Sequence, residues 1–153
     1  MTAENFARTL TVTSSPERSW AMLTDVDRLA GWVTIVHDVK ELSRLDKYTA
    51  VLQDRVGPFK LRADLDITVV VAEDGRRIEL QASGRDRAVD TRLAVAATMT
   101  LGQVPAGGTS LDVAGRYEVT GKAASLGTGV IRKKAEGIIN DFFANAEREL
   151  GST

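Results

Sequence analysis

The chain has 153 residues, of which 43% are hydrophobic and 27% charged, a balance typical of one globular domain that buries its own core. We therefore expect residues 1–153 to form a single domain. Basic and acidic residues number 20 and 21, so no overall positive field favours nucleic acid as a partner. Because the chain has no cysteine, it cannot build a disulfide, a zinc–thiolate site or an iron–sulfur cluster.

The first 31 residues predict one strand and two short helices. Apolar and polar residues alternate over residues 6–12, a period typical of a strand. Ser15 followed by Pro16 is a helix start, because serine caps the first turn and proline suits the first helical position; this helix ends near Leu23. Asp25 caps a second helix that ends near Gly31.

The middle of the chain predicts six strands in an antiparallel meander. Turn sequences such as Gly57-Pro58 separate them. The clearest alternation begins at Phe59, where one face is apolar and the other charged. We expect the apolar faces to line one concave interior. The predicted strands cover residues 37–44, 48–56, 59–72, 76–87, 90–101 and 109–119.

Residues 121–150 predict a long helix, because apolar residues there recur at helical spacing. At 1.5 Å per residue such a helix spans about 45 Å, enough to cross the sheet. Gly127 and Gly129 weaken its first turns, so its stable part is expected to start near Val130. The expected fold class is α+β: a curved seven-stranded antiparallel sheet, two short helices after the first strand, and a long C-terminal helix.

This order of elements resembles the helix-grip superfamily of START lipid-transfer domains, birch-pollen-allergen-like proteins and polyketide cyclases. Local sequence resembles one family within it, that of the carbon monoxide dehydrogenase G-subunit, over residues 6–150. The resemblance implies an accessory protein of a molybdenum-containing dehydrogenase, linked to membrane recruitment and quinone binding. The segments that carry it are Trp20-Ala-Met-Leu-Thr-Asp-Val-Asp-Arg-Leu29, Tyr48, Arg55-Val-Gly-Pro-Phe-Lys60, Gly121-Lys-Ala-Ala-Ser-Leu-Gly127 and Asp141-Phe-Phe143.

Small inward-facing residues either leave a ligand cavity or make room for Phe142 and Phe143, and the superfamily resemblance favours the cavity. Trp32 forms either its portal or part of the core. Gly57-Pro58 is either a mobile lip or an ordinary turn. Tyr117 offers one orienting hydroxyl. The predicted lining is Trp32, Phe59, Leu61, Ala63, Leu65, Ala82, Leu93, Val95, Ala97, Met99, Val113, Gly115, Tyr117, Val130, Ile138 and Phe142.

The sequence offers no strong catalytic or metal-binding motif. His37, the single histidine, can act as a general base, but its place beside Asp38 at a strand start is typical of the surface. Asp64 and Asp66 fall on the charged strand face. We therefore assign no catalytic residue, metal or cofactor. The consecutive cations Arg132-Lys133-Lys134 spread around a helix, either as a solvated face or as a docking site for acidic groups.

We therefore expect a binder of an apolar small molecule, a quinone or a lipid, with a molybdenum-containing dehydrogenase as the implied partner. Two alternatives stay open: a cyclase-like or dehydratase-like enzyme of the same fold, and a ligand-free interaction module. The N-terminus lacks a basic segment before an apolar run, and no stretch approaches the roughly 20 apolar residues of a spanning helix. The expected location is cytoplasmic, with peripheral contact at the inner membrane face left open.

Overall fold

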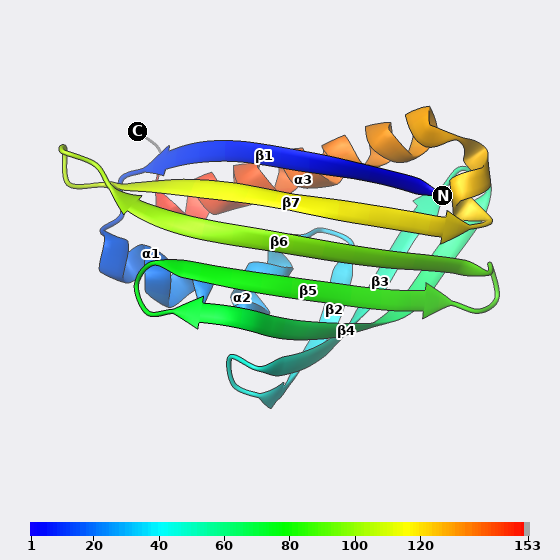
Figure 1. Cartoon of the computed structure of the whole chain (residues 1–153), viewed down its shortest axis with the longest axis horizontal. Coiled ribbons are helices and arrows are strands. Elements are labelled where there is room, and N and C mark those ends of the chain that lie inside the picture. The colour runs from blue at the N-terminus through cyan, green and yellow to red at the C-terminus, as the bar shows by residue number, and fades with distance from the viewer. Residues whose placement is uncertain (152–153) are drawn as a thin grey trace.

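The computed structural model describes residues 1–151 and has the predicted order of elements (Figure 1). The predicted fold class is confirmed. Within the described residues, no helix is both long and apolar enough to cross a membrane. The elements are β1 (Thr2–Val12), α1 (Pro16–Leu23), α2 (Val26–Gly31), β2 (Val36–Ser43), β3 (Lys47–Val56), β4 (Phe59–Glu73), β5 (Arg77–Asp86), β6 (Thr91–Gln103), β7 (Thr109–Gly121), the 3-10 helix η1 (Ala123–Leu126) and α3 (Thr128–Leu150).

The seven strands form one antiparallel sheet in the order β1-β7-β6-β5-β4-β3-β2. The first strand therefore pairs with the last, from Thr2 opposite Val119 to Val12 opposite Thr109. This pairing explains why β1 starts four residues earlier than the side-chain alternation predicts: backbone hydrogen bonds continue wherever a partner strand is present. α3 runs behind β1 and β7, along the inner side of the curved sheet (Figure 1).

The long helix begins after residue 121, where the predicted helix starts, and close to Val130, where its stable part is expected. β7 continues to Gly121, η1 follows, and the backbone breaks at Gly127 with φ +104° before α3 starts at Thr128. Gly121 has φ +92°, and a Cβ there would lie 1.9 Å from the carbonyl oxygen of Asp90. The chain can turn so closely against the β5–β6 loop only because glycine has no side chain.

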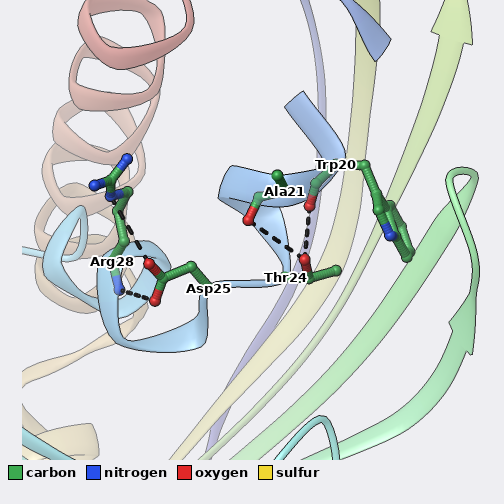
Figure 2. Close-up of polar contacts among 5 residues, drawn as sticks. All are labelled: Trp20, Ala21, Thr24, Asp25 and Arg28. Carbon is green, nitrogen blue, oxygen red and sulfur yellow. Dashed lines mark hydrogen bonds and ion pairs between the residues drawn. The ribbon is translucent and has the colours of Figure 1, made fainter. Parts of the chain in front are cut away.

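The junction between the two short helices is held by local polar contacts (Figure 2). Thr24 Oγ1 donates to the carbonyl oxygen of Trp20 at 2.8 Å, which also accepts the backbone N–H of Thr24 at 3.0 Å, and lies 3.4 Å from the carbonyl oxygen of Ala21 at the end of α1. Asp25 accepts from the backbone N–H of Arg28 at 3.3 Å, as its predicted capping role requires, and its other oxygen lies 4.0 Å from Arg28 Nε. The junction thereby sets the direction of α2 toward the interior, where Leu29 is buried.

The C-terminal end of α3 packs tightly against β1, α1 and β7. The side chains of Val12, Leu23, Leu111 and Leu150 are all buried. Backbone N–H groups just after β1 donate to the last helical carbonyls, from Ser14 to Leu150 at 3.0 Å. This end of the interior is closed, so any free volume lies farther along α3.

A buried carboxylate organises the β5–β6 loop, whose turn chemistry was not evident from the sequence. Asp86 is 6% exposed and accepts hydrogen bonds from the backbone N–H groups of Arg62, at 2.7 Å, and Val89, at 3.0 Å. The bond from Arg62 outweighs the opposing effect of burial, and the pKa of Asp86 is lowered from its ordinary value. The carboxylate thus ties β4 to this loop.

Asp86→Asn is expected to lower the free energy of unfolding at pH 7 by about 1–3 kcal/mol, because a charged acceptor of backbone N–H groups is lost. Since the folded-state pKa is depressed, this contribution is present above the unfolded pKa and is lost as pH falls through the folded pKa. The difference in the free energy of unfolding between wild type and variant should therefore become smaller below about pH 4. Urea unfolding at pH 7 and pH 3 measures it; equal stability at pH 7 would contradict this account.

Candidate functional site

A cavity of about 330 Å³ lies between the inner face of the sheet, the α2–β2 segment and α3. Its wall includes Leu29 from α2, Leu65 and Val113 from the sheet, and Ile138 from α3. Only four of its lining residues are polar or charged: Asp54, Tyr117, Glu118 and Lys134. All the others are apolar, so the cavity suits a guest held mainly by burial.

Eleven of the sixteen residues predicted for the lining are brought together around this cavity. They share the inward-facing positions of their strands, or one stripe of α3. That they bind a ligand stays a prediction. The eleven are Leu61, Leu65, Ala82, Leu93, Val95, Ala97, Met99, Val113, Tyr117, Ile138 and Phe142.

The other five predicted residues lie elsewhere, beginning with Trp32. Its side chain is buried and packs edge-to-face on Phe142, with ring centroids 5.7 Å apart, so it stands behind the lining as part of the core. Ala63 is completely buried in the core, and Phe59 is partly buried and packs against the core. Neither residue lines the cavity.

Val130 and Gly115 require a correction for different reasons. Val130 falls on the outer side of α3 and is 46% exposed, whereas the neighbouring Ile131, about two turns before Ile138 on the same face, is buried and lines the cavity. At Gly115 the space is filled by Phe6 of β1: a Cβ there would lie 2.6 Å from its ring. Phe6 itself lines the cavity.

The sequence-based prediction missed a second wall, formed by α2 and the start of β2. Val33, Ile35 and Val36 line the cavity from this side. The signal was present as an apolar run after Trp32, but such a short run has neither helical nor strand period. On α3, Ala135 and Ile139 also line the cavity, and their spacing from Ile131 and Ile138 follows the helical repeat.

The consecutive cations Arg132, Lys133 and Lys134 on α3 do not act as one cluster, because two of them pair with acidic residues on different strands. Arg132 Nη2 lies 2.5 Å from Glu4 Oε1 on β1, and Lys134 Nζ lies 2.9 Å from Asp54 Oδ1 on β3. Lys133 is exposed between them. Both members of the Lys134–Asp54 pair line the cavity, and the lysine side chain is 40% exposed. A charged group keeps its head in water, so this pair marks where the cavity reaches the solvent.

Two polar residues considered for chemistry have different surroundings. Burial, and next the negative charge of Glu4, raise the pKa of Tyr117 above its ordinary value. Its hydroxyl therefore stays protonated at neutral pH, and the residue belongs to the cavity lining. His37 is exposed on β2 and does not line the cavity. The hypothesis of a histidine base acting on a bound guest thus has no geometric support in this structure.

Solved structures with a similar fold place the chain in a known class. A conserved protein from Geobacillus kaustophilus superposes with a TM-score of 0.82 at 22% identity, over 96% of this chain and 95% of that one. A START superfamily protein from Mycobacterium smegmatis gives 0.69 at 11% identity, over 95% and 96%. Ara h 8.0201 gives 0.60 at 14% identity, over 94% and 97%. The chain therefore has the START-like helix-grip fold.

The family follows from the sequence itself. Residues 9–151 match the profile of the CoxG family, described as the G-subunit of carbon monoxide dehydrogenase, and the chain belongs to that family. This confirms the resemblance inferred from the short motifs between Trp20 and Phe143. No match was found among curated proteins.

The position of Trp32 in the core, against Phe142, can be tested by substitution. Its buried indole Nε1 has no hydrogen-bond partner among residues 1–151. Trp32→Phe removes that unpaired donor and keeps an aromatic ring against Phe142, so the free energy of unfolding should stay within about 1 kcal/mol of wild type. Trp32→Ala should lose about 3–5 kcal/mol. Denaturant unfolding of both variants decides; a loss above about 2 kcal/mol in the phenylalanine variant would show that the indole N–H has a partner.

Proposed function

We propose that the protein binds a lipophilic small molecule in the cavity between its sheet and α3. The observation that carries this proposal is the cavity itself: about 330 Å³, at the lower end of ligand-pocket volumes, with a lining that is apolar except for four residues. Burying roughly 300 Å² of a guest at about 25 cal/mol per Å² contributes about 7 kcal/mol before the costs of association. Since micromolar affinity corresponds to about 8 kcal/mol net, burial of this area does not reach it alone, and a larger buried area or hydrogen bonds from the polar lining residues would have to supply the rest.

The finer proposal is a quinone-like or lipid-like guest. Its apolar body would contact aliphatic side chains such as Leu65, Val95 and Ile138. Its carbonyl oxygen would find donors in the Tyr117 hydroxyl and the Lys134 ammonium, which both line the cavity. These two donors favour a guest with hydrogen-bond acceptors over one with a cationic end.

The family description supports a proposed biological setting. Because the family is described as part of carbon monoxide dehydrogenase, we propose an accessory role beside a molybdenum-containing oxidoreductase of that type, in the cytoplasm or at the inner membrane face. The protein would hold its guest out of water and present it to the partner. The structure supports this role through its cavity, while the partner is inferred from the family alone.

Native mass spectrometry of protein purified under mild conditions tests the proposal, together with organic extraction of any bound molecule. A mass increment that disappears on extraction is expected, with the extract containing a quinone or lipid. A protein that is recovered empty, and that takes up neither a short-chain quinone nor a fatty acid ester on titration, would contradict ligand binding.

Ala97→Leu is expected to weaken binding of a short-chain quinone at least about tenfold, because the larger side chain projects into the cavity. Ala96→Leu is the matched control: Ala96 is the adjacent residue of β6, is exposed, and does not line this cavity. Calorimetric titration measures both affinities, and thermal unfolding checks the fold. Equal affinities of the two variants for the quinone would show that the quinone does not bind in this cavity. Gly115 is unsuitable for this test, because a side chain there would meet the backbone of Ala96.

A further inference from the structure

One carboxylate stands in the inward-facing row of β3, where its neighbours are apolar. Every second residue of a strand faces the same side, so Asp54 shares its face with Leu52 and Val56, which are buried. Across the β3–β4 ladder, Asp54 is opposite Leu61, which is also buried. All four residues line the cavity, and the Asp54 side chain is only 12% exposed. An acidic group thus takes a place in an apolar wall.

A cation interrupts the facing stripe of α3 in the same way. Lys134 comes three residues after Ile131 and four before Ile138, the spacing of one helix face, and all three line the cavity. Its Nζ lies 2.9 Å from Asp54 Oδ1. The cavity wall therefore contains two opposite charges, one from the sheet and one from the helix, which meet across otherwise apolar rows.

The other acidic residue of the lining has its own partner on the outer face of the sheet. Glu118 follows Tyr117 on β7, so its side chain leaves the strand on the opposite side from the Tyr117 ring. Its carboxylate lies 3.4 Å from Arg116, which shares that outer face. The charges that face the cavity are therefore those of Asp54 and Lys134.

Packing alone gives no reason for this pair. Removing two charges from water costs free energy that their attraction does not always offset, and apolar residues of similar volume in their place are often equally or more stable. Leucine at Asp54 and methionine at Lys134 would simply continue the two apolar rows. A fold is expected to break such a local rule mainly at functional sites. The pair therefore indicates a polar task on the cavity wall.

The pair keeps hydrogen-bonding capacity for a third group. Asp54 Oδ1 accepts the backbone N–H of Arg55 at 2.8 Å and is the oxygen nearest to Lys134. The second oxygen, Oδ2, accepts no hydrogen bond from any of residues 1–151. The ammonium group of Lys134 has three N–H donors, more than one ion pair uses. An acceptor and a donor are thus available side by side.

Electrostatics decides which head group suits this pair. An anionic head would be attracted by Lys134 but repelled by Asp54, a cationic head the reverse, and either would lose its hydration on entering an apolar cavity. A carbonyl or ether oxygen only accepts, so it can use the ammonium alone. A hydroxyl group can donate to the carboxylate and accept from the ammonium at the same time. A neutral hydroxyl therefore matches both members of the pair.

We propose that Asp54 and Lys134 form a head-group subsite that binds the neutral hydroxyl of a lipophilic alcohol and rejects the carboxylate of a fatty acid. The two residues determine specificity, whereas the apolar wall supplies affinity. This inference rests on the proposed function, since it needs a guest in the cavity. It narrows the lipid-like guest of that proposal to one with a hydroxyl end.

Calorimetric titration with decanol, its isomer methyl nonyl ether, and decanoate tests the subsite. Wild type should bind decanol at least about tenfold more tightly than the ether, which has the same atoms but no donor, and at least about tenfold more tightly than decanoate. In Asp54→Leu/Lys134→Met the preference for decanol over the ether should disappear or reverse, because a buried hydroxyl then has no partner. Thermal unfolding checks that each variant folds.

The matched control is Glu4→Leu/Arg132→Met. It removes the other ion pair between α3 and the sheet, at residues that do not line the cavity, and should keep the preference for decanol. If the first double variant does not fold, Asp54→Asn takes its place. That variant removes the negative charge, so Lys134 should raise the affinity for decanoate at least about tenfold.

The subsite is overturned if wild type binds decanol and the ether equally, if decanoate binds as tightly as decanol, or if the Asp54 and Lys134 substitutions leave these preferences unchanged. Equal binding of decanol and the ether would still show a lipophilic guest, so the proposed function would stand without the subsite. A wild type that binds none of the three compounds would contradict the proposed function, and the subsite with it.

Discussion

The architecture depends on one close backbone approach, at the point where the sheet ends and the chain turns back. Gly121 lies so near the Asp90 carbonyl that no side chain fits, and the N–H of Lys122 donates to that same oxygen. From there η1 and the break at Gly127 direct α3 back along the inner face of the sheet. Any larger residue at Gly121 would displace the start of α3, and with it the wall of the cavity.

The cavity exists because α3 meets the sheet closely at one end and loosely in its middle. Ala146 and Leu150 are buried against the closed end, whereas Ile138 and Phe142 border free volume. Phe142 and Phe143 contact each other edge-to-face, with ring centroids 5.4 Å apart, and Phe142 also packs edge-to-face against Trp32. The aromatic rings therefore pack among themselves at one side, and small residues such as Ala82 and Ala97 leave the remaining space open.

Alternation and helical spacing predicted the fold and most of the lining, because strands with one wet face determine which side chains point inward. Three errors have identifiable physical causes. Val130 was placed inward although Ile131, which lies seven residues or about two helical turns before Ile138, is the residue on that face, a spacing that the sequence itself contains. Gly115 looked like free space because its filler, Phe6, comes from the far end of the chain. The apolar residues around Ile35 that line the cavity follow neither a helical nor a strand period, so their orientation could not be predicted.

The two ion pairs of α3 determine which part of the cavity wall is easiest to move. In its first half α3 buries Ile131 and pairs Arg132 with Glu4 on β1 and Lys134 with Asp54 on β3; the more exposed pair, that of Arg132, contributes only about 0–1 kcal/mol. The second half is held by buried apolar groups such as Phe143 and Ala146, whose separation from the sheet would require far more free energy. The start of α3 is therefore the part of the cavity wall that is held least firmly, and the closed end the part that is held most firmly.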